Sequence, residues 1–405
     1  MPTLAASVAS SVMMIPGTVA TCLLVWWMCV FATPDLFLDT EQLVQADGYT
    51  SQTHHVVTED GYELTLHRLL PHQGHRSRAL PVLMQHGIFH SSADFVVPGP
   101  GHALGYALSD AGYDVWLANS RGNFYSRRHL SLATNTPQYW NFSWHQMGQY
   151  DLPAVIDFIL NETRSEALFY VGHSMGAAVF FAMLHLRPEY NRKIRVMFGL
   201  APASYMHHGK SPVTIPIFKS MHINKILLDR LGVGEILPRD SPWHQLVSSA
   251  CGPNRVLMQP VCMRVLGHIS GYNLANLNKT RLDINLSHFP AGSSRNTAAH
   301  FGQNIISGKF LQFDYGREGN LVQYGQEKPL PYDLGKVTAP VSLYCGTGDL
   351  VIDCQDVERL FHELTQCRDK NLTHLQRYSH LDFLWGIDAM PRLYSPIIHI
   401  MDQYS

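Results

Sequence analysis

Runs of apolar residues that do not alternate with polar ones recur along the chain, and turn-forming residues bound each run. This pattern predicts strands that are buried on both faces. Between two of these runs, residues 151–163 carry apolar side chains at the spacing of one helix face. Strands that alternate with helices indicate a parallel sheet covered by helices. The predicted strands lie within residues 79–87, 108–122, 167–174 and 193–203.

Two further patterns mark the limits of this α/β region. Residues 54–69 contain two β-rich runs around Glu59-Asp60-Gly61, which predicts a hairpin. The α/β rhythm stops near Ala203, and the segment to Asp333 is irregular, Met-rich and helical in pattern. Strand and helix patterns then return and end in a helical stretch. The sequence therefore predicts an α/β core in two parts, residues 33–202 and 334–405, with a helical insertion over residues 203–333.

The composition narrows the class of function. The chain has 405 residues, 46% of them hydrophobic, which is enough for a substantial core. Only 15% of the residues are charged and the formal net charge is −2. This excludes a disordered chain and the concentrated basic surface that nucleic-acid binding needs. The sequence contains no CxxC pair and no HExxH, so we expect no metal and no other cofactor.

The N-terminal segment indicates export. Residues 1–34 contain no charged side chain, and an apolar run ends in small residues near position 32. This predicts a signal peptide over residues 1–32. An uncleaved membrane anchor is the alternative, because the apolar stretch from Val12 is almost long enough to span a bilayer. The first Lys or Arg is Arg68, which favours export of the remainder of the chain.

Glycosylation sequons and cysteines fit an exported chain. Five Asn-x-Ser/Thr sequons occur, at Asn141, Asn161, Asn278, Asn285 and Asn371. Seven cysteines include two in the expected signal peptide, which leaves an odd number and therefore at least one thiol that is free or pairs between chains. Cys251 and Cys262 are close enough in sequence for a small loop. The sequence does not pair the other three cysteines, Cys345, Cys354 and Cys367.

Ser174 is the candidate nucleophile. It is the centre of Gly172-His173-Ser174-Met175-Gly176, between a predicted strand and a helix of small residues. Strand, G-x-S-x-G and helix in this order form a nucleophile elbow, whose tight turn leaves no room for side chains at Gly172 and Gly176. The alternative is a serine that lies between two glycines by chance. The strand before it and the helix after it favour the nucleophile.

A serine nucleophile of this type needs a histidine and an acid later in the chain, in the order serine, acid, histidine. His380 lies in the loop after the last predicted strand, whereas His362, His374 and His399 fall inside predicted helices or a strand. Asp349 lies just past a predicted strand end, after two glycines that make the turn, and we prefer it to Asp353 as the acid because it is nearer the strand end. A carboxylate there would fix the imidazole tautomer and stabilise the imidazolium. We expect Asp382, close to His380, to be structural.

The oxyanion of the reaction needs two backbone donors. The amide of Met175 follows the serine at a helix N-terminus, and the second donor is expected after the strand that ends at His86-Gly87, at Ile88. Their side chains are free to vary, because only the amides act. We expect a structural role for the His86 ring, and a loop-bracing role for Arg121.

Taken together, these segments resemble the acid lipase family of gastric and lysosomal lipases and their insect digestive relatives. The resemblance runs from Asp47 to the C-terminus. It rests on "VVTEDGYELTLHR", "LMQHGIFHSSADF", "LSDAGYDVWLANSRGN", "YVGHSMGAA", "NKTRLDINLSHFPAGSS", "GTGDLVID" and "YSHLDF". It implies an α/β-hydrolase core with an inserted helical cap and a lid over the active site. It also implies a catalytic triad of Ser174, Asp349 and His380, with oxyanion amides at Ile88 and Met175.

The same resemblance matches Cys251–Cys262 to the family's cap disulfide and Asn278 to a glycosylation site. Met175 stands where glutamine is common, which leaves its backbone donor intact, and the spacing of the cap cysteines also differs. The lid is the least similar region. Its apolar segments, residues 211–218 and 256–269, suit a cover for an acyl chain, although we expect most of these side chains to pack inside the cap itself.

The expected function is a secreted or lysosomal serine lipase that hydrolyses triacylglycerols or sterol esters through an acyl-enzyme, with neutral lipid as its partner and no cofactor. One alternative is a general carboxylesterase or thioesterase acting on smaller soluble esters. Another is a catalytically silent lipid carrier; such proteins usually lose a triad member, whereas this chain keeps all three candidates. The sequence does not indicate the oligomeric state.

Overall fold

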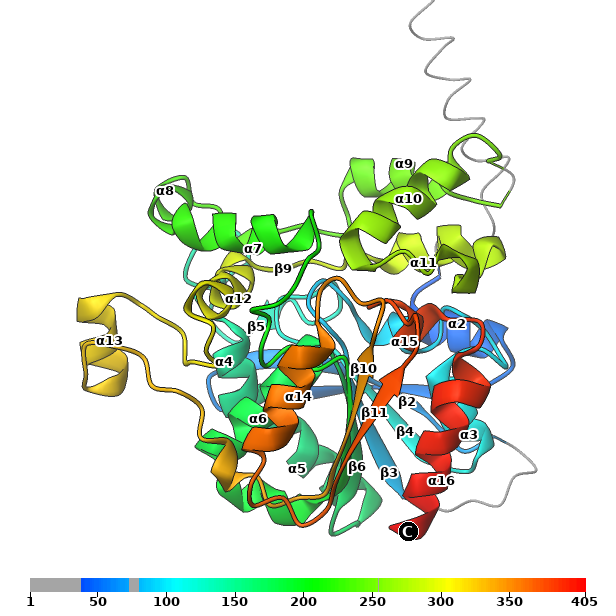
Figure 1. Cartoon of the computed structure of the whole chain (residues 1–405), viewed down its shortest axis with the longest axis horizontal. Helices are drawn as coiled ribbons and strands as arrows, with labels where there is room; N and C mark the ends of the chain where they lie inside the picture. Colours follow the sequence, from blue (N-terminus) through cyan, green and yellow to red (C-terminus); the bar gives the residue numbers. More distant parts are fainter. Residues whose placement is uncertain (1–37, 73–79, 254) are drawn as a thin grey trace, which may run out of the picture.

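A nine-stranded sheet runs through the centre of the molecule (Figure 1). The computed structural model describes residues 38–72, 80–253 and 255–405, so the expected signal peptide lies outside the described residues. The strand order is β1-β2-β4-β3-β6-β7-β10-β11, with β5 beside β2. The first two pairs along this order are antiparallel, and all neighbours from β4 to β11 are parallel.

The strands fall where the apolar runs predict them. Every residue of β3, β4, β6 and β10 is buried, as expected for strands without alternation. The predicted hairpin is also confirmed, because β1 and β2 pair antiparallel with His54 opposite Leu66. The bounds are β1 (Ser51–Val57), β2 (Tyr62–Leu69), β3 (Pro81–Gln85), β4 (Asp114–Ala118), β5 (Arg128–His129), β6 (Leu168–His173), β7 (Ile194–Leu200), β10 (Val341–Gly346) and β11 (Lys370–Leu375).

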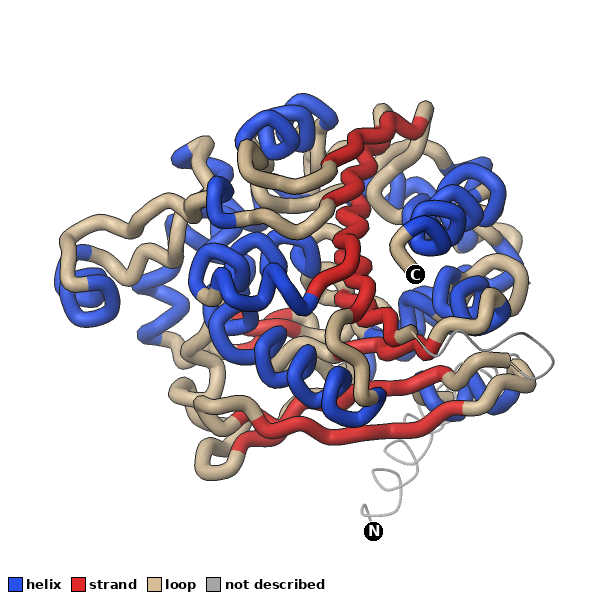
Figure 2. The backbone as a smooth tube through the Cα atoms, turned by 90° about the horizontal axis from the view of Figure 1, so that it is seen from below, coloured by secondary structure: helices blue, strands red, loops and turns tan. Residues whose placement is uncertain are grey.

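Helices cover both faces of the sheet. Figure 1 shows α3 and α16 on one side and α5, α6 and α14 on the other, and Figure 2 shows helices flanking the strands from a second direction. The helix predicted over 151–163 is α5, which follows one turn of π-helix and buries Val155, Ile156 and Ile159. The bounds are α2 (Thr40–Ala46), α3 (Leu104–Asp110), α4 (Trp144–Gln146), α5 (Leu152–Thr163), α6 (Met175–Leu186), α14 (Cys354–Glu363), α15 (Asp382–Trp385) and α16 (Ser395–Gln403).

The segment between β7 and β10 contains helices and two very short strands. Figure 1 shows α7 to α11 above the carboxyl end of the sheet, and α13 projecting from the side of the molecule. The helix α12 packs against α7 and is buried over most of its length. The bounds are α7 (Thr214–Ile223), α8 (Lys225–Arg230), β8 (Glu235–Ile236), α9 (Pro242–Ala250), α10 (Gln259–Ser270), α11 (Leu282–His288), β9 (Ser293–Ser294), α12 (Arg295–Ser307) and α13 (Arg317–Tyr324).

Two disulfides constrain loops at this end of the sheet. Cys251 and Cys262 join the end of α9 to α10, and Cys345 and Cys354 join the end of β10 to the start of α14. Cys367 is the free cysteine within the described part of the chain, in agreement with the odd count. None of the helices in the described ranges is both long enough and apolar enough to span a bilayer.

Candidate active site

Ser174 occupies a strained turn between β6 and α6. Its backbone has φ 52° and ψ −114°, a conformation that a residue with a side chain rarely adopts. A Cβ atom on Gly172 would lie 2.8 Å from the amide nitrogen of Ala177, and one on Gly176 would lie 2.3 Å from the carbonyl oxygen of Gln85. Both glycines are therefore required by close backbone approach. This is the steric reason for which the sequence predicts an elbow here.

Asp349 and His380 come together as predicted from the sequence. The Nδ1 atom of His380 lies 2.7 Å from Oδ2 of Asp349, and the Asp349 side chain is fully buried. The other carboxylate oxygen accepts hydrogen bonds from the amides of Val351 and Ile352, at 2.7 and 2.9 Å. The carboxylate is thus held from two sides. It fixes the proton of His380 on Nδ1 and leaves Nε2 as the basic nitrogen.

Asp353, the alternative candidate for the catalytic acid, has a structural role. Asp353 is the N-cap of α14, where its side chain accepts a hydrogen bond from the amide of Gln355. It also pairs with Lys210, whose Nζ lies 2.6 Å from Oδ2. This ammonium group and the capping amide lower the pKa of Asp353 despite partial burial. Asp353 therefore holds a helix start and a surface lysine, and Asp349 is the carboxylate at the imidazole.

The loop of His380 is anchored to its surroundings. Its amide donates to the carbonyl of Ser270 at 3.0 Å, and its carbonyl accepts from Nε2 of His173 at 3.1 Å. Two residues on, Asp382 is buried and accepts hydrogen bonds from Asn273, Asn276 and the amide of Ser379. Asp382 thus has the structural role that the sequence predicts. The three other late histidines lie in α14, β11 and α16, away from this loop in the chain.

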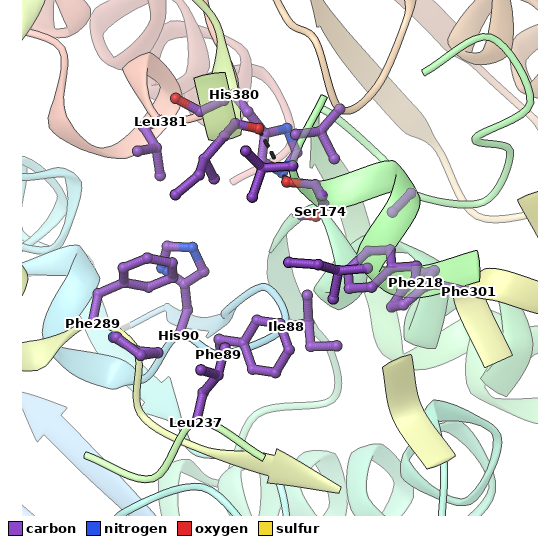
Figure 3. Close-up of a pocket in the computed structure, with 18 of the residues that line it drawn as sticks. Ile88, Phe89, His90, Ser174, Phe218, Leu237, Phe289, Phe301, His380 and Leu381 are labelled. Atoms are coloured by element: carbon purple, nitrogen blue, oxygen red, sulfur yellow. Dashed lines mark hydrogen bonds between the residues drawn. The ribbon is translucent and has the colours of Figure 1, made fainter. Parts of the chain in front are cut away.

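Ser174 and His380 line one apolar cavity of about 290 Å³ (Figure 3). Ile88 also lines this cavity, three residues after the end of β3. Met175 is the first residue of α6, where backbone amides have no acceptor within the helix. Because β3 and β6 are parallel neighbours, Ile88 and Met175 follow adjacent strands at the same sheet edge. This adjacency supports the predicted pair of amide donors, and their role as an oxyanion hole stays a prediction.

His86 and Arg121, which we expected to be structural, are buried, and both form hydrogen bonds within the protein. His86 donates from Nδ1 to the carbonyl of Gly87, and its Nε2 accepts from the amide of Ser120. Burial lowers the pKa of His86 to about 4, so the ring is neutral at neutral pH. Arg121 forms charged hydrogen bonds with Asp60 and Asp151. The guanidinium therefore braces the loop after β4 and does not face the cavity.

The apolar segments of residues 211–218 and 256–269 behave differently from expectation. We expected most of these side chains to pack inside the cap, and this is wrong. Four apolar side chains are buried, namely Ile215, Phe218, Met263 and Leu266. Five large apolar residues of the second segment are exposed instead. Periodicity shows that a helix has an apolar side but not whether that side finds a protein partner. The exposed residues are Val256, Leu257, Met258, Val261 and Val265.

Sequence reasoning missed one polar residue of the cavity. His90 lies in the loop after β3, lines the cavity and is 5% exposed. Its partner is Asp94, four residues on, at a spacing that could have indicated the pair. One potential metal-binding group also exists among the described residues, Cys345, Cys354 and His374, but its two sulfurs are bonded to each other and are not free thiolates.

The glycosylation candidates differ in exposure. Asn141 and Asn161 are exposed, and Asn278 is half-buried, with its Oδ1 accepting from the amide of Thr280. Asn285 is buried, at 2% exposure, which makes it a poor acceptor in the folded chain. Glycosylation of Asn141, Asn161 and Asn278 stays a prediction.

Comparison with known proteins places this arrangement in a family. A model described as "Partial alpha/beta-hydrolase lipase region" matches residues 40–99, and one described as "alpha/beta hydrolase fold" matches residues 81–214. Lipase 3 of Drosophila melanogaster is 37% identical over 386 residues, covering 95% of this chain and 98% of that protein. Gastric triacylglycerol lipase of Bos taurus is 35% identical over 378 residues, covering 91% of this chain and 92% of that protein.

The chain belongs to the acid lipase family. The fold of this acid lipase is also that of more distant hydrolases. A soluble variant of monoglyceride lipase from Saccharomyces cerevisiae, solved with a substrate analogue, superposes with a TM-score of 0.56 at 15% identity. The match covers 88% of this chain and 95% of the yeast protein, and at this identity it shows the α/β-hydrolase fold alone. The fold class predicted from the sequence is confirmed.

Proposed function

We propose that this acid lipase hydrolyses the ester bonds of neutral lipids, triacylglycerols or sterol esters, through a covalent acyl-enzyme. One observation carries the proposal: Ser174 and His380, whose Nδ1 contacts Asp349, line the same cavity, and the remainder of that cavity lining is almost entirely apolar. Long acyl chains favour such a lining because their transfer out of water is favourable in proportion to the apolar area buried. The family relationship to a triacylglycerol lipase supports the same substrate class.

The reaction follows from the roles of the three side chains. Oγ of Ser174 attacks the ester carbonyl carbon while Nε2 of His380 takes its proton. The carbonyl oxygen becomes an oxyanion, which the amides of Ile88 and Met175 stabilise. The tetrahedral intermediate collapses, the bond to the alcohol oxygen breaks, and His380 returns the proton to the leaving alcohol. Water, activated by His380, then attacks the acyl-enzyme and releases the fatty acid. Asp349 stabilises the imidazolium in both steps.

The proposed division of the chain into a hydrolase core and a cap suits this reaction. In this proposal residues 33–202 and 334–405 form the hydrolase core, and residues 203–333 form a cap with a lid. Four side chains of residues 213–218, at the start of α7, line the cavity, namely Val213, Thr214, Ile217 and Phe218. A cover of this kind excludes water from the acyl-enzyme and holds an apolar chain.

Export into the secretory pathway, with delivery to the extracellular space or the lysosome, completes the proposal. It is supported by the uncharged apolar N-terminal segment, the sequons and the two disulfides. Disulfides persist in oxidising compartments and are rare in the cytosol.

The test is fatty-acid release from emulsified triolein, a cholesteryl ester and a short soluble ester by the wild type and by Ser174→Ala, from acidic to mildly alkaline pH. We expect release from at least one emulsion that depends on Ser174. Release confined to the short ester would replace the lipase with a general esterase. Equal release by both proteins would remove Ser174 from the mechanism.

A further inference from the structure

The cavity contains a second imidazole–carboxylate pair besides that of His380 and Asp349. Nδ1 of His90 lies 2.8 Å from Oδ1 of Asp94, and the two side chains are 6% and 0% exposed. His90 lies in the loop after β3, and Asp94 lies in the short 3₁₀-helix of residues Ser92–Phe95 that follows. Figure 3 shows His90 beside Phe289, with open space between them and the side chains of Ser174 and His380.

Local structure fixes this pair. Asp94 is the third residue of the 3₁₀-helix and closes a capping box, in which its Oδ2 accepts a hydrogen bond from the amide of Ser91 at 3.0 Å. The other oxygen is thereby directed at His90. The ring of His90 is also held from its face by Phe289, with ring centroids 4.5 Å apart. The Nδ1 edge of the ring therefore faces Asp94 in a charge contact rather than in a well-aligned hydrogen bond, and Nε2 is on the opposite edge.

The other polar side chains of the cavity already have a task. Thr214 donates to the carbonyl of Ile269, and Ser270 donates to the carbonyl of Leu266. Ser174 and His380 belong to the reaction itself. Apart from Ser174 and His380, His90 is the polar side chain of the cavity lining that makes no hydrogen bond within the described residues: Nδ1 has only its ion-pair contact with Asp94, and Nε2 has no partner. In a cavity lined by hydrocarbon, one such nitrogen selects the oxygen atoms of a ligand.

We propose that His90, positioned by Asp94, is a specificity-determining residue that recognises a free hydroxyl group on the alcohol part of the ester. A neutral ring with its proton on Nδ1 accepts a hydrogen bond at Nε2, and a protonated ring donates one from the same atom. A hydroxyl group can donate and accept, so it pairs with Nε2 in either state. Among acylglycerols, the diacylglycerols and monoacylglycerols that hydrolysis of a triacylglycerol releases carry this hydroxyl group, so we expect them to be favoured over sterol esters and other esters of hydrocarbon alcohols. This inference rests on the proposed function.

We expect selectivity because a bound substrate that lacks the hydroxyl group leaves Nε2 of His90 buried without a hydrogen-bond partner. Leaving a buried polar atom unpaired costs free energy, so such a substrate binds and reacts less well. We expect a preference of about 10- to 100-fold in kcat/KM for the hydroxyl-bearing substrate. A residue that only fills the cavity wall would produce no such preference.

The test compares two esters that differ in one oxygen atom. These are 1,2-dioctanoylglycerol and propane-1,2-diyl dioctanoate, in which hydrogen replaces the free hydroxyl group. We measure kcat/KM for both with the wild type, His90→Phe, His90→Gln, Asp94→Asn and Phe218→Leu, and thermal unfolding of each variant. His90→Phe keeps a ring of similar size but has no polar atom. Phe218→Leu alters the cavity wall without removing a polar atom and is the matched control, because the ring of Phe218 packs against Phe301 and not against His90.

We expect the ratio of the two kcat/KM values to fall to about 1 in His90→Phe and to be partly restored in His90→Gln, which can accept and donate. Asp94→Asn should lower the ratio, whereas Phe218→Leu should change both rates together and leave the ratio as it is in the wild type. A wild-type ratio near 1, or a ratio unchanged in both His90→Phe and His90→Gln, overturns the inference while the lipase function stands. Absence of Ser174-dependent hydrolysis of either ester removes the proposed function and the inference with it.

Discussion

His380 and Asp349 form a pair in which the carboxylate is completely buried and the imidazole reaches the cavity. The Nδ1–Oδ2 distance is 2.7 Å, and both carboxylate oxygens have partners. An imidazole held in this way keeps its proton on Nδ1, so that Nε2 is basic toward the serine hydroxyl. The proposed chemistry depends on this geometry, and removal of the charge tests it directly.

Replacement of Asp349 by Asn should lower kcat by about 10³- to 10⁴-fold, because the amide cannot stabilise the imidazolium and favours the wrong tautomer. The measurement is hydrolysis of a soluble ester under saturating conditions. Asp353→Asn is the matched control and should retain kcat within about twofold, since Asp353 contacts Lys210 and the start of α14. Equal losses in the two variants would contradict the assignment of the acid.

The elbow glycines should tolerate no side chain. In Gly176→Ala the new Cβ would lie 2.3 Å from the backbone oxygen of Gln85, and neither β3 nor α6 can move without disturbing Ser174. We expect a loss of at least about 2 kcal/mol in the free energy of unfolding, measured by urea titration. Gly101→Ala is the control, because its Cβ would meet no atom within 4 Å and only the positive φ of 77° is penalised, by about 1 kcal/mol. Equal losses would show that crowding is not the cause.

The disulfide between Cys345 and Cys354 should support catalysis as well as stability. It joins the two ends of the loop that carries Asp349, between β10 and α14. The double variant Cys345→Ser/Cys354→Ser should lose about 2–3 kcal/mol of stability and also lose kcat far below its melting temperature. The control is Cys251→Ser/Cys262→Ser, which opens a loop of similar length in another region. We expect kcat to fall in the Cys345→Ser/Cys354→Ser variant and not in the control. Equal kcat values in the two double variants would show that the Cys345–Cys354 disulfide contributes to stability alone.

Buried neutral histidines should make the fold less stable in acid. Burial lowers the pKa of His145 from 6.5 to about 4, and its Nδ1 lies 2.7 Å from the hydroxyl of Tyr332. Between pH 6.5 and about 4 the unfolded chain binds a proton that the folded chain does not, so stability falls as the pH falls through this window. At pH 4 the penalty approaches about 3 kcal/mol for this residue.

His145→Gln isolates this contribution, since glutamine keeps a polar partner for Tyr332 but does not titrate. The free energy of unfolding is measured from urea titrations at pH 7 and pH 4.5 for both proteins. We expect the wild type to lose more stability than the variant between these pH values. Parallel losses would mean that His145 is already protonated in the folded state or that its proton is taken up equally in both states.

The core strands could be predicted from the sequence because their signals are local. Fixed rules of chain order indicated Asp349 and His380, whose side chains are in contact, and the catalytic roles of the triad stay a prediction. Apolar runs placed β3, β4, β6, β7 and β10. The choice between Asp349 and Asp353 depended on which carboxylate faces His380, and that contact joins two loops 31 positions apart. The pairing of Cys345 with Cys354 depended in the same way on how β10 meets α14. These relationships exist only once the chain is folded.

The cavity wall and the cap surface were harder to predict for another reason. His90 and Asp94 occupy a loop without periodicity, so no pattern indicated that one faces the cavity and the other supports it. In α10, spacing identified apolar residues, but whether they are covered depends on what packs above them. The structure buries Met263 and Leu266 and leaves Val261 and Val265 exposed.

The exposed apolar residues of cap segment 256–265 should contribute to activity on emulsified lipid. Leu257 is 87% exposed and Val261 51% exposed, on the segment that precedes and begins α10. Apolar side chains gain free energy when they leave water for a lipid surface, at about 25 cal/mol per Å². We expect Leu257→Ser/Val261→Ser to lower the rate on triolein emulsion about 5- to 20-fold and to leave kcat/KM on a short soluble ester near the wild-type value. Val322→Ser, at an 81% exposed position on α13, is the control and should alter neither rate. Two outcomes would show that Leu257 and Val261 do not contact the lipid surface. One is an equal loss of emulsion activity in Leu257→Ser/Val261→Ser and in the control, and the other is an equal loss on both substrates in Leu257→Ser/Val261→Ser.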